Sequence, residues 1–229
     1  MKTETLWKSS FFLVVFFLLA SLSASGKEYP YLWSACTTHF QNGIDGREKN
    51  IEAAAKILDG YQFLPGVEFS FNETVTRTIP EEDMVLAACL IGDKRVPDLG
   101  GGLCQVASTL YDAALRAGIS IRERKAHSSL VRYIAPGLDA TVSSDEGVDL
   151  KIQNPYRQPL LVKTSVEKEN LTISIFGLQP KKGRVRILVS RPEEKSGYIY
   201  TFTRRVVINN DQESFSEIVS RDRYRLPKE

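Results

Sequence analysis

A glycine-rich turn followed by a cysteine is the feature of this chain that could do chemistry. Residues 100–111 read Gly-Gly-Gly-Leu-Cys-Gln-Val-Ala-Ser-Thr-Leu-Tyr, and the cysteine is Cys104. Apolar residues at helical spacing predict a helix over residues 104–117, which places Cys104 in its first turn. The unpaired N–H groups and partial positive charge of a helix N-terminus favour a thiolate over a thiol. Of the three cysteines in the chain, Cys104 is therefore the predicted nucleophile.

A histidine and an aspartate follow this cysteine in an order that suits thiol catalysis. His127 is one of only two histidines and comes after a strand expected to start at Ile119. A strand packed antiparallel to the preceding helix would return His127 toward Cys104, where its imidazole could hold the thiolate and shuttle a proton. Asp139 comes one short strand later and could fix the imidazole tautomer. Plainer interpretations also stand: a cysteine packed under its turn, a surface histidine, and an aspartate that caps the turn at Gly137.

Polar neighbours of Cys104 are expected to bind substrate or to support the helix. Gln105 follows it, and Ser108 shares its helix face, where the hydroxyl could bond the sulfur or a carbonyl of its own helix. A backbone N–H of the first helical turn is the expected oxyanion donor for acyl transfer. No cysteine or histidine cluster has zinc spacing, and the glycine run lacks the Lys-Ser/Thr of a phosphate loop. We therefore expect neither a metal nor a cofactor.

The overall composition argues against some classes of protein. The chain has 229 residues and a formal net charge of +2. Residues 1–26 contribute +1, from Lys2 and Lys8 against Glu4, which leaves +1 for the remainder. A charge so near zero gives no support to nucleic-acid binding or to a polybasic contact with a membrane. No repeat or low-complexity linker is present, so residues 27–229 are expected to form one domain.

The N-terminal segment has the pattern of a signal peptide. Lys2 and Lys8 precede an unbroken apolar run over residues 11–20, and small residues follow as far as Gly26. The run is short for a membrane span. We expect residues 1–26 to be a signal peptide, with an uncleaved membrane anchor as the alternative, and the protein to work outside the cytoplasm, in a bacterial cell envelope or secreted. Thiols pair readily there.

The other two cysteines leave the disulfide question open. Three is an odd number, so at least one thiol stays free or pairs with another molecule. Cys89 lies in an apolar run and resembles a buried small hydrophobe. Cys36 either pairs with Cys89 or is free.

The first half of the chain has helical patterns. Apolar residues recur at spacings of three and four, with Asp45 as a possible N-cap and Gly60 and Gly118 as stops. Residues 64–72 are expected to form a turn and a short strand. Helices are expected over residues 46–58, 81–91 and 104–117.

The second half has strand patterns, with alternating apolar and polar residues between polar turns. Strands are expected over residues 119–124, 130–134, 140–142, 148–152, 159–166, 171–176, 184–189 and 198–208. Helices first and strands afterwards predict an α+β fold, with the N-terminal helices packed on an antiparallel sheet. The C-terminal strands should reach about residue 210, and the polar residues near the C-terminus should be loose. The order of helix with cysteine, strand with histidine and next strand with aspartate is also that of transglutaminase-like thiol enzymes.

Several ordered stretches resemble the VanW family. Two departures are visible: Leu138 stands where the family usually has arginine before the aspartate of Gly-x-Asp-Ala, and no G5 or peptidoglycan-binding module is evident. Together the stretches span a core at about residues 34–180. They are residues 47–51, 64–72, 100–111, 123–128, 133–142 and 148–154.

The resemblance implies L,D-transpeptidation of peptidoglycan stem peptides, with Cys104 as the nucleophile. The thiolate would attack the carbonyl before a terminal D-alanine, which leaves with a proton from His127, and the amine of a second stem would take the acyl group to give a 3–3 cross-link. Arg47, Asn72 and Arg124 are candidates to bind stem carboxylates, with scaffold ion pairs as the alternative. Two other functions stay open, a thiol hydrolase such as an L,D-carboxypeptidase and a non-catalytic envelope-binding module. The oligomeric state is also open.

Overall fold

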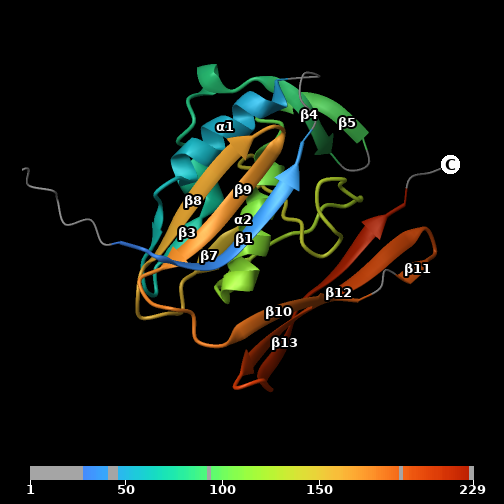
Figure 1. The fold of residues 1–229 in the computed structure, drawn as a ribbon. Coiled ribbons are helices and arrows are strands. Elements are labelled where there is room, and N and C mark those ends of the chain that lie inside the picture. The colour runs from blue at the N-terminus through green and yellow to red at the C-terminus, as the bar shows by residue number, and fades with distance from the viewer. Residues whose placement is uncertain (1–27, 41–45, 92–93, 191–192, 227–229) are drawn as a thin grey trace, which may run out of the picture.

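The computed structural model describes residues 28–40, 46–91, 94–190 and 193–226 (Figure 1). The side chains of residues 89–95 are outside this description. The predicted signal peptide and the predicted cap Asp45 also lie outside the described residues. In the part of the chain that is described, no helix has the length and apolar character needed to cross a membrane.

A four-stranded antiparallel sheet supports the two main helices. Its strand order is β1–β9–β8–β2, and α2 lies against β1 and β9 while α1 lies against β8 (Figure 1). Alternate side chains of β9, Leu171, Ile173 and Ile175, are fully buried in the core. The bounds of these elements are β1 Tyr31–His39, β2 Gln62–Phe63, β8 Leu160–Glu167, β9 Asn170–Gly177, α1 Arg47–Leu58 and α2 Leu103–Ala117.

Smaller elements surround this unit. A three-stranded sheet has the order β3–β7–β6, and β4 and β5 form a hairpin beside α1. A C-terminal sheet of β10 to β13 extends away from the main sheet as an arm (Figure 1). The remaining bounds are β3 Glu68–Ser70, β4 Leu86–Ile91, β5 Lys94–Leu99, β6 Ser120–Glu123, β7 Lys151–Gln153, β10 Arg184–Val189, β11 Glu193–Lys195, β12 Tyr198–Asn209 and β13 Gln212–Arg225, with a π-helical turn at Asn72–Thr76 and a 3-10 turn at Glu81–Asp83.

Helix α2 is the central element of the molecule. All of its residues except Cys104 and Arg116 are buried. A helix that is buried all round needs packing on every side, and α2 meets α1 as well as strands β1, β9, β10 and β6. Its N-terminal end, with Cys104, opens onto a cavity.

The structure confirms the antiparallel sheet and places most of the expected helices and strands, but several elements differ from the prediction. Residues 81–91 form a 3-10 turn and strand β4, because a short apolar run fits a strand as well as a helix. Residues 130–134 and 140–142 form irregular loops instead of strands. Strand β1 has no counterpart in the prediction, and the end expected to be loose forms β13, which pairs with β12 along most of its length.

Candidate active site

The glycine turn before α2 fixes the position of Cys104. Gly102 is the N-cap of α2 and adopts a left-handed conformation with φ 116°. Gly101 has no room for a side chain, because an added Cβ would lie 2.6 Å from backbone atoms of Ala87. The buried Asn50 amide donates to the Gly101 carbonyl over 2.9 Å and so holds the turn against α1. The first helical turn therefore presents the thiol from a rigid support.

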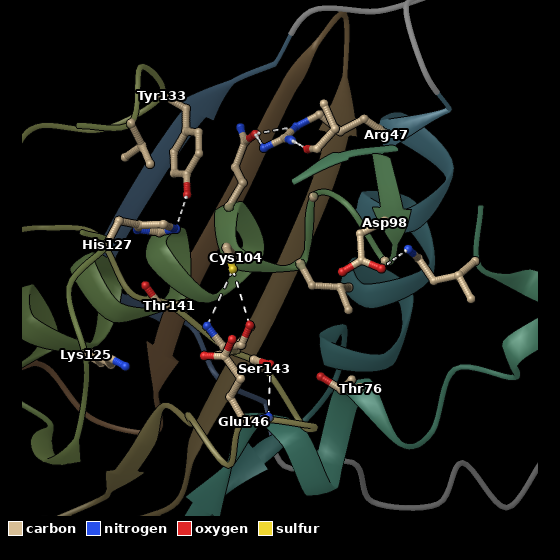
Figure 2. Close-up of a pocket in the computed structure, with 18 of the residues that line it drawn as sticks. Arg47, Thr76, Asp98, Cys104, Lys125, His127, Tyr133, Thr141, Ser143 and Glu146 are labelled. Atoms are coloured by element: carbon tan, nitrogen blue, oxygen red, sulfur yellow. Dashed lines mark hydrogen bonds between the residues drawn. The ribbon is translucent and has the colours of Figure 1, made fainter. Parts of the chain in front are cut away.

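Cys104 is half-buried on the wall of a cavity of about 1160 Å³. Its Sγ lies 3.4 Å from the Val142 carbonyl oxygen and 3.5 Å from the Val142 nitrogen (Figure 2). A thiol can donate to the carbonyl, and a thiolate can accept from the N–H. Val142 can therefore satisfy the sulfur in both protonation states.

His127 lies beside Cys104 and is only 5% exposed. Its Nδ1 is 2.6 Å from Asp139 Oδ2. Its Nε2 is 3.5 Å from the Tyr133 hydroxyl (Figure 2). Burial lowers the pKa of His127, but its hydrogen bonds to Asp139 and Cys104 and their negative charges raise that pKa to about 9. The imidazole is therefore held as a cation at neutral pH.

Asp139 is fully buried, and four donors bind its carboxylate. Oδ2 accepts the His127 side chain and the His127 backbone N–H over 2.7 Å. Oδ1 accepts Arg124 Nη2 over 3.0 Å and the Tyr224 hydroxyl over 2.6 Å. Burial raises the pKa of Asp139, but these hydrogen bonds and the charges of Arg124 and His127 lower it to about 2. The carboxylate thus stays ionised and holds the imidazole in place.

The same environment favours the thiolate of Cys104. Burial raises the pKa of this thiol, but the hydrogen bond with His127, the charges of His127 and Arg47, and the Val142 N–H together lower it below its usual range. The lowered pKa of Cys104 and the raised pKa of His127 both favour a thiolate–imidazolium pair, which is the reactive state of a cysteine nucleophile.

A free backbone donor lies next to the sulfur. In the first turn of α2, the N–H groups of Leu103 and Gln105 bond to the carbonyls of Gly100 and Gly102. Among the hydrogen bonds of the described residues, none uses the backbone N–H of Cys104. This N–H could hold an oxyanion, as the sequence pattern suggests.

Two of the predicted substrate-binding residues lie at this cavity. Arg47 Nη2 donates to Gln105 Oε1 over 3.1 Å, and Nη1 donates to the Ala88 carbonyl over 3.1 Å. Gln105 is fully buried, and its amide donates to Thr38 Oγ1 over 3.0 Å, so the amide of Gln105 fixes the guanidinium of Arg47. The guanidinium lies 5.8 Å from the centre of the Tyr133 ring.

Three other predicted residues, Asn72, Ser108 and Arg124, do not line the cavity that holds Cys104. The Asn72 amide donates to the Val148 carbonyl over 2.9 Å. Ser108 donates to the Cys104 carbonyl over 2.7 Å, which is the helix-carbonyl alternative, and accepts the Ala140 N–H over 2.8 Å. These bonds fit the scaffold roles that the sequence left open for Asn72 and Ser108, and their contact with substrate stays a prediction.

Arg124 forms the scaffold ion pair that the sequence left open as the alternative, because its guanidinium binds carboxylates of the protein itself. It pairs with Asp139 and, over 2.5 Å, with Asp222, and its side chain is only 4% exposed. Tyr133, Asp222 and Tyr224 were missed by the sequence reasoning. Tyr133 begins one of the VanW-like stretches, so that motif could have indicated it, whereas the two β13 residues carry no local signal.

The other described cysteine is a free thiol. Cys36 is buried and forms no disulfide, and burial together with the nearby Asp112 carboxylate raises its pKa. The Cys89 side chain lies outside the description. Within the described residues, no group of three or more His, Cys, Asp or Glu side chains comes together as a metal site.

Comparison with known proteins gives this geometry a context. Residues 46–176 match the family model described as VanW like protein. Over 155 residues the chain is 34% identical to the uncharacterized protein YoaR of Bacillus subtilis, which covers 68% of this chain and 51% of that protein. Over 195 residues it is 26% identical to the vancomycin B-type resistance protein VanW of Enterococcus faecalis. That match covers 78% of this chain and 70% of VanW. The chain thus spans about half the length of YoaR, and no solved structure matches it.

Proposed function

Because this chain belongs to the VanW-like family, we propose that it is a cell-wall thiol acyltransferase, and specifically an L,D-transpeptidase that forms 3–3 cross-links between peptidoglycan stem peptides. The observation that carries the proposal is the linked set of Cys104, His127 and Asp139 at a cavity of about 1160 Å³. A nucleophile, a base and a group that orients the base are the parts that covalent acyl transfer requires.

The first half-reaction forms a thioester. Cys104 Sγ attacks the carbonyl that joins the L-centre of the diamino acid to the terminal D-alanine, and the Cys104 N–H stabilises the oxyanion. The C–N bond then breaks, and the D-alanine amine takes a proton from the imidazolium of His127. Asp139 keeps Nδ1 of that ring occupied, so the proton leaves from Nε2.

The second half-reaction moves the acyl group to an amine. The side-chain amine of a second stem attacks the thioester, His127 takes the proton, and the thiolate of Cys104 is released. Amines compete well with water for a thioester where water is partly excluded. Water in place of the amine would give a carboxypeptidase.

Arg47 is the proposed anchor for the carboxylate of the departing D-alanine. Its guanidinium lines the cavity, and Gln105 and the Ala88 carbonyl hold it in one orientation. Arginine pairs strongly with carboxylates when its planar group is fixed in this way. Such an anchor makes the D-alanine carboxylate part of substrate recognition.

The cellular location is part of the same proposal. The protein named VanW, a vancomycin resistance protein, supports a role at the cell wall for this chain. The signal-peptide pattern of residues 1–26 supports export. Together they favour a protein that meets its substrate in the envelope.

Product analysis tests the proposed function. The purified protein is incubated with a disaccharide-tetrapeptide, and the products are weighed by mass spectrometry. A transpeptidase gives dimers and free D-alanine, a hydrolase gives tripeptide monomers, and a binding module leaves the substrate unchanged. The Cys104→Ser variant should fold but make no dimers, because a hydroxyl is poorly ionised at neutral pH. The Cys36→Ser variant is the matched control and should keep activity.

A further inference from the structure

The last described strand, β13, reaches the candidate active site from outside the family-matched residues 46–176. Its Arg225 N–H donates to the carbonyl of Ser128, the residue after His127, over 2.6 Å. One residue earlier, the Tyr224 hydroxyl donates to Asp139 Oδ1 over 2.6 Å and accepts the Gly137 N–H over 2.7 Å. β13 thus touches the segments that carry both the imidazole and the carboxylate.

A second link runs from β13 through Arg124. Asp222 Oδ1 is 2.5 Å from Arg124 Nη1, while Nη2 and Nε of the same guanidinium bind the Asp139 carboxylate and carbonyl over 3.0 and 2.6 Å. The Asp222 and Arg124 side chains are 8% and 4% exposed. Ser220 donates to the other Asp222 oxygen over 2.7 Å, which fixes that carboxylate. Arg124 is therefore shared between a carboxylate of the site and a carboxylate of β13.

We propose that Tyr224 and Asp222 of β13 are positioning residues that set the orientation and protonation of the His127–Asp139 pair. The C-terminal sheet is then a part of the candidate active site. The inference rests on the proposed thiol chemistry, but its test is independent of any peptide substrate.

The two residues act on Asp139 with opposite electrical effects. The Tyr224 hydroxyl stabilises the charge of the carboxylate and so weakens its pull on the His127 proton. Asp222 offsets the positive charge of Arg124, which leaves more of the Asp139 charge to act on His127. The ionisable groups around this pair are Cys104 and Tyr111 of α2, Arg47 of α1, Tyr133 and Arg124 of the loops, and Asp222 and Tyr224 of β13.

The test follows the imidazole of His127 by NMR as a function of pH. The chain has only two histidines, so a His39→Gln variant assigns the signals. Tyr224→Phe should raise the pKa of His127 and Asp222→Asn should lower it, each by roughly half a unit to one unit. Glu217→Gln is the matched control, because it also removes an arginine–carboxylate pair on β13, with Arg205, but has no link to Asp139. It should leave the pKa of His127 unchanged.

A second measurement is used for a variant that folds too poorly for the NMR titration of His127. The rate of Cys104 alkylation by iodoacetamide is followed against pH in the same proteins. In the wild type the alkylation rate should change near pH 9, where the His127 imidazolium loses its proton. Asp222→Asn should move this change to lower pH, and Tyr224→Phe should move it to higher pH. Loss of packing alone would shift both variants the same way, and that result, or no shift in either, overturns the inference. If the wild type makes no dimers while the opposite shifts are seen, the proposed function fails and the positioning role stands.

Discussion

At the scale of single residues, the saturation of Asp139 decides the chemistry of the site. A carboxylate offers about four lone-pair positions, and four donors fill them here. These donors stabilise the charged carboxylate and hold its pKa at about 2, far below the pKa of about 9 of His127, so the proton stays on the imidazole, whose charge favours the thiolate of Cys104. The buried Asp139 carboxylate thus favours the His127 imidazolium, and the imidazolium in turn lowers the pKa of Cys104.

The first prediction at this scale concerns thiol reactivity. Iodoacetamide should label Cys104 well below pH 8 and much faster than Cys36, because His127 and Arg47 lower the pKa of Cys104 whereas burial raises that of Cys36. Peptide mapping of the labelled protein at several pH values measures both rates. The rate at Cys104 should change again near pH 9, where the His127 imidazolium loses its proton. Equal slow labelling of the two cysteines would contradict an activated thiol.

At the scale of elements, the glycine turn and α2 control where the thiol lies. Gly101→Ala should lower the free energy of unfolding by about 1–3 kcal/mol and slow the alkylation of Cys104, because the new Cβ would meet rigid backbone of Ala87. Urea unfolding measures the change. Gly66→Ala is the control: its φ is +72° with nothing within 4 Å of an added Cβ, so only the left-handed strain of about 1–2 kcal/mol remains and alkylation is unchanged. A Gly101→Ala variant with normal alkylation would show that the turn does not position the sulfur.

Local patterns predicted the elements whose packing is local. Helices α1 and α2 and the hairpin of β8 and β9 follow from apolar periodicity and nearby turns. The same patterns failed for β13. Its polar residues face solvent, and its strand conformation depends on pairing with β12. They also failed for residues 130–142, where the loop is held by long-range contacts such as the Tyr224 hydroxyl on Gly137.

The residues of the candidate site also fall into a group that local patterns reveal and a group that depends on long-range contacts. Cys104, His127 and Asp139 could be found because they lie within 36 residues, in motifs with recognisable chemistry. The role of Arg124 could not, because its second carboxylate comes 98 residues later in the chain. A lone arginine in a sequence looks the same whether its partner is a substrate or the scaffold.

At the scale of the whole molecule, Asp139 links the site to acid stability. Burial raises its pKa, but its hydrogen bonds and the neighbouring cations lower it from 3.8 to about 2. A carboxylate with a depressed folded-state pKa stabilises the protein above its unfolded pKa, and this contribution is lost as the pH falls from about 4 through 2. Its size is about 2 kcal/mol. Urea unfolding of the wild type at pH 7, 4 and 2.5 should show this loss, and Asp139→Asn should lack that part of the pH dependence. An identical pH dependence in the two proteins would contradict the depressed pKa.

The late position of β13 in the chain also has a consequence for biosynthesis. A ribosome makes Cys104 and its helix more than a hundred residues before Tyr224. A nascent polypeptide that ends near residue 220 already carries the sulfur but has neither Asp222 nor Tyr224. The orientation that we propose β13 gives to the His127–Asp139 pair therefore depends on residues synthesised well after the sulfur, and proteolytic removal of β13 would take away Asp222 and Tyr224 while leaving Cys104 in place.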